Sequence, residues 1–349
     1  MQQELLKNAQ VSRFENVSIL SVAHVDAPLR ITSASIEDQL VTTMKRIGIR
    51  ADLFRELSGV IERRFWAKGF QPSDGAAEAG RLAIERAGVD RSQIGILINS
   101  SVSRDFIEPS TASIVHGKLG LAASCLNFDL GNACLAFVNS MDVVGNMIER
   151  GQIDYGIVVN GESARFVVEN TIKLLQDPAT DGDDFRANFA TLTIGSGAAA
   201  MVLARSDLAP EGHRYLGGVN IAATEHRDLC HGQVDHMVTD TKDLLRNGLD
   251  LAARTWRTAC QKLGWAANPP DHFVFHQVSK VHTEKLAGIL GIDLRKVFRL
   301  YPNFGNVGPA GVPIVLSKIL EDGRLLKGHR VALMGIGSGL NCTMAEVVW

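Results

Sequence analysis

The stretch IGSG at residues 194–197 recurs at residues 336–339, and this repeat is the strongest indication of the fold. Each copy precedes a stretch that is typical of a strand, AAAMVLA after the first and LNCTMAEVVW after the second. Upstream of each copy, a Gly-Asn pair leads into a helical stretch, at 131–132 and at 305–306. One tetrapeptide often recurs by chance, but the same order of features rarely does, so the order indicates an internal duplication.

The strands before the two Gly-Asn pairs extend the repeated order. Each of these predicted strands ends in a polar residue, Asn99 in the first half and His276 in the second. The order strand, Gly-Asn-helix, IGSG-strand therefore runs through the chain twice. We expect two halves related by a pseudo-twofold axis, residues 15–205 and residues 206–349.

Short apolar strands alternate with helical stretches along the chain, which predicts an α/β fold. Several strands are apolar on both faces, as expected where helices cover both sides of a sheet. The helix after Cys134 is apolar nearly all round, which is typical of a buried helix. The predicted strands are 94–99, 154–160, 198–203, 272–276, 330–334 and 343–349. The predicted helices are 74–87, 134–149, 242–262, 281–290 and 309–321.

Composition excludes several classes of function. The 349 residues are 46% hydrophobic, which is enough for a large core. Lys and Arg number 36 against 38 Asp and Glu, so the chain lacks the positive charge that nucleic-acid binding needs. The first ten residues, MQQELLKNAQ, do not resemble a secretory signal, and no apolar run is long enough to span a membrane. We therefore expect a cytoplasmic protein.

The five cysteines show no C-x-x-C spacing, which argues against a zinc site and against disulfides. We expect free thiols, most of them buried and one of them reactive. The stretch 174–191, LLQDPATDGDDFRANFAT, contains Pro, Gly and four aspartates, and it is typical of an exposed loop. A role of that loop in substrate binding or in an interface stays open.

Cys134 is the best candidate for the reactive thiol. It follows a Gly-Asn turn at the start of a predicted buried helix. A helix N-terminus offers unpaired N–H groups and a partial positive charge, which favour the thiolate form of a nucleophile. The alternative for an arbitrary cysteine is a small buried hydrophobic residue.

His276 and Asn306 occupy comparable places in the second half, at the end of a strand and at the Gly-Asn turn. Each has an ordinary structural interpretation, as a core histidine and as a turn former. The duplication gives a reason for both to lie beside Cys134. There they could donate hydrogen bonds to a thioester carbonyl as one oxyanion hole, and the GIGSGL turn at 335–340 could supply backbone N–H groups to a second.

These residues stand in motifs that resemble the thiolase superfamily, most of all its ketoacyl-ACP synthase III branch. The resemblance covers essentially the whole chain and implies a duplicated five-layer αβαβα fold. A narrower resemblance is to the OleA family, which condenses long-chain acyl-CoA molecules in olefinic hydrocarbon synthesis. The segments that carry the resemblance are SGVIERRFW (58–66), SVSRDFIEPSTASIV (101–115), GNACLAF (131–137), MVTDT (237–241), HQVS (276–279), NFGNVGPAGVPIVL (303–316) and GIGSGLNCTMAEVVW (335–349).

The resemblance implies a role for each candidate residue. It implies that Cys134 accepts an acyl group from the first thioester, and that His276 and Asn306 polarise the carbonyl of the second. It implies that the backbone N–H groups of Cys134 and Ser338 form the oxyanion hole of the acyl-enzyme. Read without the resemblance, Glu108 is an acid near the start of a helix, next to Pro109. The resemblance implies that Glu108 reaches into the partner's active site of a homodimer and acts as the base.

The chain departs from the branch in the stretch 56–60, ELSGV, which lacks the arginine that often binds the coenzyme A nucleotide there. Arg63, Arg64 and Trp66 follow closely and could bind a phosphate or adenine instead. The alternative is a solvated basic turn.

The expected function is an acyltransferase that joins two long-chain acyl-CoA molecules by a non-decarboxylative Claisen condensation, with no metal or redox cofactor. Downstream pathway enzymes are expected partners. One alternative is a decarboxylating synthase III that uses malonyl-ACP. Others are a thioesterase and a non-catalytic paralogue that serves as a binding partner.

Overall fold

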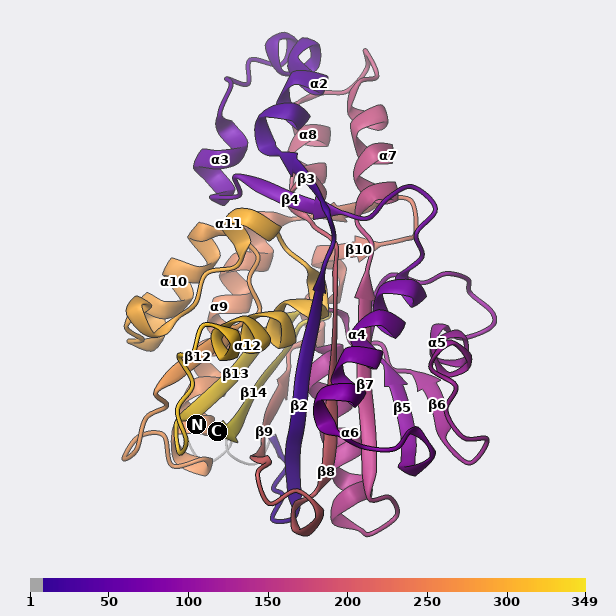
Figure 1. The fold of residues 1–349 in the computed structure, drawn as a ribbon. Coiled ribbons are helices and arrows are strands. Elements are labelled where there is room, and N and C mark those ends of the chain that lie inside the picture. Colours follow the sequence, from indigo (N-terminus) through magenta and orange to yellow (C-terminus); the bar gives the residue numbers. More distant parts are fainter. Residues whose placement is uncertain (1–8) are drawn as a thin grey trace.

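Ten strands form one mixed sheet in the computed structural model, which describes residues 9–349 (Figure 1). Nine of them follow the order β12-β13-β14-β9-β2-β8-β7-β5-β6, and β1 pairs with β9. The strands of this sheet are β1 (Gln10–Val11), β2 (Val17–Asp26), β5 (Ile94–Asn99), β6 (Leu126–Asp129), β7 (Tyr155–Glu162), β8 (Gly197–Arg205), β9 (His213–Ala222), β12 (His272–Phe275), β13 (Arg330–Gly337) and β14 (Asn341–Val348).

The pairing of these strands has the same pattern on both sides of the β2–β9 junction. β5 is parallel to β7, and β7, β8 and β2 follow in antiparallel order. β12 is likewise parallel to β13, and β13, β14 and β9 follow in antiparallel order. β2 and β9 join the two sets antiparallel. Arg205 ends β8 and His213 begins β9, so the predicted boundary at 205/206 falls between the two sets, although it stays a prediction.

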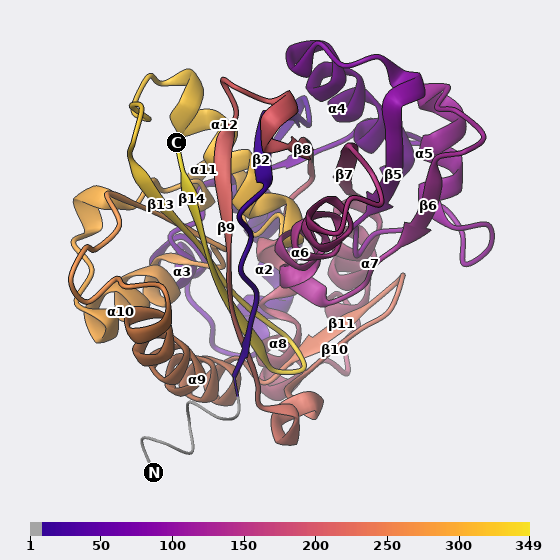
Figure 2. The same ribbon diagram turned by 90° about the horizontal axis from the view of Figure 1, so that it is seen from below.

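Helices lie on both faces of each half-sheet. α4 and α5 cover the first half-sheet and α9 covers the second, with α10 against α9, while α6 and α12 lie between them (Figure 2). Among the described residues, the order helix, sheet, helix, sheet, helix gives the α/β architecture that the sequence predicts. These helices are α4 (Pro72–Ala87), α5 (Thr111–Leu119), α6 (Ala136–Glu149), α9 (Thr241–Lys262), α10 (Lys280–Leu290) and α12 (Gly311–Glu321).

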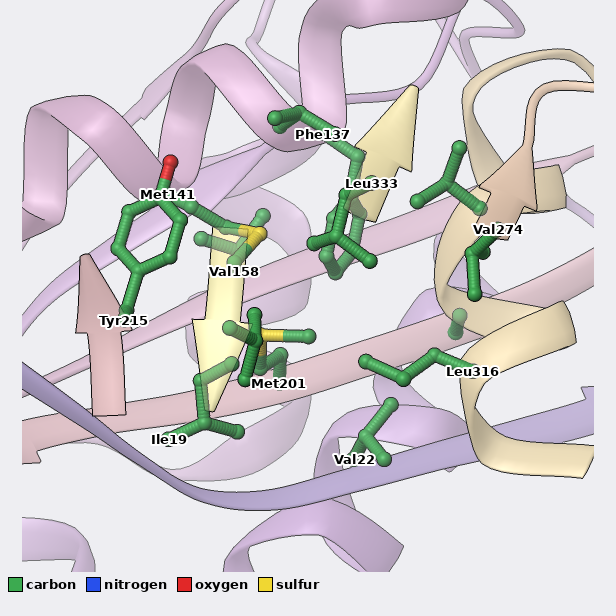
Figure 3. Close-up of a cluster of buried hydrophobic side chains, with 14 of the residues drawn as sticks. Ile19, Val22, Phe137, Met141, Val158, Met201, Tyr215, Val274, Leu316 and Leu333 are labelled. Carbon is green, nitrogen blue, oxygen red and sulfur yellow. The ribbon is translucent and has the colours of Figure 1, made fainter. Parts of the chain in front are cut away.

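The central layer contains a large hydrophobic core (Figure 3). Phe137 and Met141 from α6 and Leu316 from α12 are fully buried there. The prediction that the helix after Cys134 is buried is therefore correct, although α6 begins only at Ala136. Strand residues from both half-sheets, such as Ile19 and Leu333, complete this core, so the two halves cannot separate without exposing it.

A smaller group of elements covers the upper end of the sheet in Figure 1 and has its own hydrophobic cluster. The predicted exposed loop 174–191 is partly wrong, because it contains a helix whose Phe185 is buried. Asp181 caps that helix by accepting the N–H groups of Asp183 and Asp184. These elements are α2 (Ser33–Arg46), α3 (Leu53–Ser58), α7 (Arg165–Leu175), α8 (Gly182–Asn188), β3 (Leu29–Thr32) and β4 (Glu62–Phe65).

The remaining short elements lie near the edges of the candidate site. They are the hairpin of β10 (Cys230–Gly232) and β11 (Met237–Thr239) and the short helix α11 (Tyr301–Phe304). Within residues 9–349, no helix is both long and apolar enough to cross a membrane.

Candidate active site

Cys134 lies in a 3₁₀ turn, Ala133–Leu135, between the end of β6 and the start of α6. Ala133 has φ +45°, in the left-handed region that residues other than glycine rarely adopt. Such strain costs about 1–3 kcal/mol and is kept mainly where function needs the geometry. The turn therefore has the character of a functional site rather than of an ordinary helix start.

The surroundings of the Cys134 thiol disfavour its charged form. Burial raises its pKa to about 12, and the nearby Cys230 and Glu162 act in the same direction. These effects oppose the one that the sequence predicts for a helix N-terminus, which here begins two residues after Cys134. That Cys134 reacts as a thiolate stays a prediction.

His276 follows directly on β12, where its N–H donates to the carbonyl of Met334 at 2.7 Å. Its imidazole is buried, and neither ring nitrogen has a hydrogen-bond partner. Burial and, to a smaller extent, His282 lower its pKa to about 3, against an opposing effect of the Gly308 backbone. The ring is thus neutral at physiological pH, with one donor and one acceptor available. Two unpaired polar atoms at a buried position point to a ligand.

Asn306 is fixed by backbone contacts with the first IGSG segment. Its N–H donates to Thr193 at 3.0 Å, and its carbonyl accepts from Gly195 at 2.8 Å. A Cβ at Gly195 would collide with the carbonyl oxygen of Phe304, so only glycine allows this approach. The side-chain Oδ1 accepts from the Gly308 N–H at 2.9 Å, which leaves the amide NH₂ as a donor.

The second IGSG segment lies against the first Gly-Asn turn in the same way. A Cβ at Gly337 would lie 3.3 Å from the Asn132 carbonyl oxygen and 3.6 Å from the Cys134 nitrogen. Asn341 donates a side-chain hydrogen bond to Asn132 at 3.2 Å. Ser338 follows Gly337 in the turn, so the structure brings it beside Cys134. Each half of the chain thereby supports the Gly-Asn turn of the other.

Asn132 and Asn341 are residues that the motif analysis missed. The Asn132 amide donates to Asn139 at 2.7 Å, one turn into α6. Asn139 in turn donates to Asn220 at 3.2 Å and Thr343 at 3.3 Å. This chain of side-chain hydrogen bonds ties the nucleophile turn to β9 and β14. The signal in the sequence was their place in the repeat, Asn132 in the first Gly-Asn pair and Asn341 just after the second IGSG segment.

Glu108 lies apart from this group. It is exposed, in the loop between β5 and α5. α5 begins at Thr111 with Ser110 as its cap, so Glu108 precedes the cap and does not belong to the first helical turn. Its neighbours Phe106 and Ile107 are 60% and 87% exposed, which is unusual for large apolar side chains.

Glu162 at the end of β7 is a second acid that sequence reasoning missed. It is buried, and burial raises its pKa to about 7, against the effect of its hydrogen bonds. It accepts hydrogen bonds from the N–H groups of Val102 at 2.8 Å and Ser103 at 3.0 Å. The signal in the sequence was an acid at the end of the apolar strand YGIVVNGE.

Two of the three residues considered for coenzyme A binding are buried. Arg63 donates to the Ile31 carbonyl at 3.2 Å, and burial lowers its pKa to about 10. Trp66 donates to the Glu162 carbonyl at 2.9 Å. These contacts favour a structural role for both. Arg64 is half-buried with its guanidinium 5.0 Å from the centre of the Phe304 ring, and a substrate role stays a prediction.

Comparison with known proteins shows which family the chain resembles. The family of 3-oxoacyl-[acyl-carrier-protein] synthase III C-terminal domains matches residues 260–349. The acyl-CoA:acyl-CoA alkyltransferase of Xanthomonas campestris is 52% identical over 96% of this chain and 99% of its own. That of Shewanella oneidensis is 35% identical over 97% and 100%.

Solved structures agree with these relatives. Cerulenin-bound OleA of Xanthomonas campestris has a TM-score of 0.95 and 52% identity, over 97% of this chain and 98% of that one. A Cys-to-Ser variant of that enzyme, solved with bound lauric acid and lauroyl-CoA, also has a TM-score of 0.95 and 52% identity, over 96% and 100%.

Proposed function

The chain belongs to the OleA family of acyl-CoA:acyl-CoA alkyltransferases, in the ketoacyl-ACP synthase III branch of the thiolase superfamily, and from this premise we propose how its site works. It is an acyltransferase with the thiolase fold, and it condenses acyl-CoA molecules. The observation that carries the residue assignment is the reciprocal contact of each IGSG segment with the opposite Gly-Asn turn. That contact supports the assignment of Cys134 and Asn306 to one site, and the contact that a Cβ at Gly335 would make with both Leu135 and His276 supports the inclusion of His276.

In the first step, the Cys134 sulfur attacks the carbonyl carbon of one acyl-CoA. A new C–S bond forms, the bond to coenzyme A breaks, and coenzyme A leaves as the thiol. Because burial raises the pKa of the Cys134 thiol, the neutral His276 ring accepts its proton and returns it to the leaving group. The backbone N–H groups of Cys134 and Ser338 stabilise the oxyanion.

In the second step, another acyl-CoA places its carbonyl against His276 and Asn306. Glu108 of the partner subunit removes a proton from the α-carbon, and the two donors stabilise the enolate oxygen. The α-carbon attacks the acyl group on Cys134, a C–C bond forms, and the C–S bond breaks with the electron pair on sulfur. The product is a 2-alkyl-3-ketoacyl thioester; the Cys134 sulfur regains a proton, and Glu108 loses the one that it took, through solvent. No step needs a metal or redox cofactor.

The homodimer that this step needs has support in the exposed surface around Glu108. β6 is the last strand of the main sheet and an open edge, next to the loop with Phe106 and Ile107. An open edge with exposed apolar side chains is typical of an interface. The large apolar residues exposed in this region are Val102, Phe106, Ile107, Leu126 and Phe128.

The acyl groups are proposed to be long. The relative solved with lauroyl-CoA binds such a chain, and the identity of 52% extends over nearly the whole length. We also propose a cytoplasmic enzyme that supplies downstream enzymes of olefinic hydrocarbon synthesis.

The decisive experiment supplies a long-chain acyl-CoA as the only substrate and identifies products by mass spectrometry. A 2-alkyl-3-ketoacyl product, or the ketone derived from it, supports the proposal. An absolute requirement for malonyl-ACP would establish a decarboxylating synthase instead. Release of free fatty acid alone would establish a thioesterase.

A further inference from the structure

The loop that carries Glu108 is fixed at its root to the end of β7. The Ser100 N–H donates to the Val159 carbonyl at 2.9 Å, and the Gly161 N–H donates to the Ser101 hydroxyl at 2.8 Å. The Ser163 N–H donates to the Ser103 hydroxyl at 3.0 Å. The first residues of the loop thus continue the β5–β7 pairing beyond the sheet.

Glu162 is at the centre of this attachment. Its Oε1 accepts from the Val102 N–H at 2.8 Å, and its Oε2 accepts from the N–H and hydroxyl of Ser103 at 3.0 and 2.8 Å. The Asn160 amide adds a contact at 3.3 Å. Hydrogen bonds to a charged acceptor are stronger than those between neutral groups, so one carboxylate holds two successive loop residues firmly.

The same carboxyl also borders the catalytic residues of its own subunit. A Cβ at Gly308 would lie 3.7 Å from the carboxyl carbon of Glu162, and Gly308 donates to the Asn306 side chain. Glu162 also contributes to the raised pKa of Cys134. Glu162 therefore lies between two parts of its own subunit. On one side are Cys134 and Gly308, and on the other is the loop that carries the exposed Glu108.

Beyond the root, the loop has one more anchor and then projects into solvent. Asp105 accepts from the Ser73 N–H at 2.9 Å. Phe106, Ile107 and Glu108 follow and are exposed. The position of Glu108 is thus set by the fixed residues before it and by α5 after it.

We propose that Glu162 is a positioning residue for the condensation step, which fixes the root of the Glu108 loop and so sets where Glu108 lies in the partner's active site. This rests on the proposed role of Glu108 across the dimer. It means that each subunit contributes two acids to the reaction in its partner's site. Glu108 is the base, and the buried Glu162 fixes the position of Glu108. A misplacement of about 1 Å in such a group is enough to lower the rate about a hundredfold.

The anchor depends on pH. Protonation makes one of the two carboxyl oxygens a donor, so the carboxyl can no longer accept equally well from both amide N–H groups. Because the pKa of Glu162 is raised to about 7, the carboxyl gains its proton as the pH falls through about 7, and the anchor weakens. Condensation should decline there, and Glu162→Gln, which resembles the protonated form, should lack this decline. Among the described residues, the groups facing this carboxyl are Val102, Ser103, Asn160, Gly308 and the titratable Cys134.

Mixed dimers with differently tagged subunits test the proposal directly. A Cys134→Ala subunit combined with a Glu108→Ala subunit keeps one complete site, and this mixture is the reference. Glu162→Gln in the Cys134→Ala subunit, which supplies Glu108, should lower condensation about tenfold or more. The same change in the Glu108→Ala subunit, which supplies Cys134, should lower it about twofold at most.

Equal losses in both arrangements, or a loss only in the second, would overturn the proposal, as would no loss in either. An inactive reference mixture would instead contradict the cross-subunit role of Glu108, and the inference with it. Should Glu162→Gln fail to fold, Ser103→Ala removes the hydrogen bonds that the Ser103 hydroxyl makes with Glu162 and Ser163, and it should produce a smaller loss in the first arrangement only. Glu162→Asp keeps the carboxylate and should restore part of the activity together with its pH dependence.

Discussion

The turn that carries Cys134 and the loop that carries Glu108 follow two neighbouring parallel strands, β6 and β5, but they are built in opposite ways. The Cys134 turn is covered by the second IGSG segment and held by side-chain hydrogen bonds from the other half of the chain. The tip of the Glu108 loop is exposed and apolar. In the proposed mechanism, acyl transfer to Cys134 therefore uses groups of one chain, while condensation needs Glu108 of a second chain.

Removal of the nucleophile from the Cys134 turn should have the largest effect on activity. Cys134→Ala should lower both coenzyme A release and condensation about 10⁴-fold or more, because no other group can hold the acyl chain. A thiol-detection assay measures coenzyme A release, and mass spectrometry of the products measures condensation. Cys260→Ala, in α9 away from the site, is the control and should remain active. Substantial turnover by Cys134→Ala would contradict covalent catalysis.

Removal of the base should separate the two steps. Glu108→Ala should lower condensation about 10³-fold while the acyl-enzyme still forms, since proton abstraction belongs only to the second step. Intact-protein mass spectrometry should detect the acyl group on Cys134. The exposed Glu211 offers a matched control, Glu211→Ala. Loss of the acyl-enzyme in Glu108→Ala would show that the two regions do not divide the reaction in this way.

The protonation state of Cys134 can be measured in the native enzyme. Because burial holds its pKa near about 12, the thiolate fraction increases about tenfold per pH unit over the accessible range. Alkylation of Cys134 by iodoacetamide should thus accelerate about 10²-fold from about pH 7 to about pH 9 without a plateau. Peptide mass spectrometry identifies the site, with Cys134→Ala as the blank. A plateau near about pH 7 would establish a stabilised thiolate.

Loss of the side-chain hydrogen bond from Asn341 to Asn132 should have the smallest effect, confined to the Cys134 turn. Asn341→Ala should lower kcat for acyl transfer about tenfold and leave KM nearly unchanged, because the oxyanion donors of Cys134 and Ser338 lose their common support. Steady-state kinetics separates these constants. Asn146→Ala, on the exposed side of α6, is the control. A change in KM alone would place the effect in substrate binding.

Local patterns were sufficient to predict much of the fold. The strand 94–99 was predicted with its observed ends, and the buried α6 and the long α9 were recognised from their apolar spacing. β2 and β9, which join the half-sheets, were not predicted. Their sequences VSILSVAHVD and HRYLGGVNIA contain polar residues and glycines that weaken the alternation expected of a strand.

The site was predictable only where the duplication related the two halves. Cys134, His276 and Asn306 occupy positions that the repeat itself singles out. Glu162 was missed because an acid at a strand end is usually solvated, and only the fold shows it to be buried. The sequence did not show that burial raises the pKa of Cys134, because the desolvation of a side chain depends on packing from distant parts of the chain.

The support of Cys134 by Asn341 has a consequence for the order of synthesis. Residues 132 and 341 are 209 positions apart, so a ribosome adds the second long after the first. At about 5–20 residues per second, Cys134 exists for many seconds before Asn341 is there to support its turn. If that support is needed for acyl transfer, the growing chain gains the activity only after Asn341 has been added and the two halves have docked.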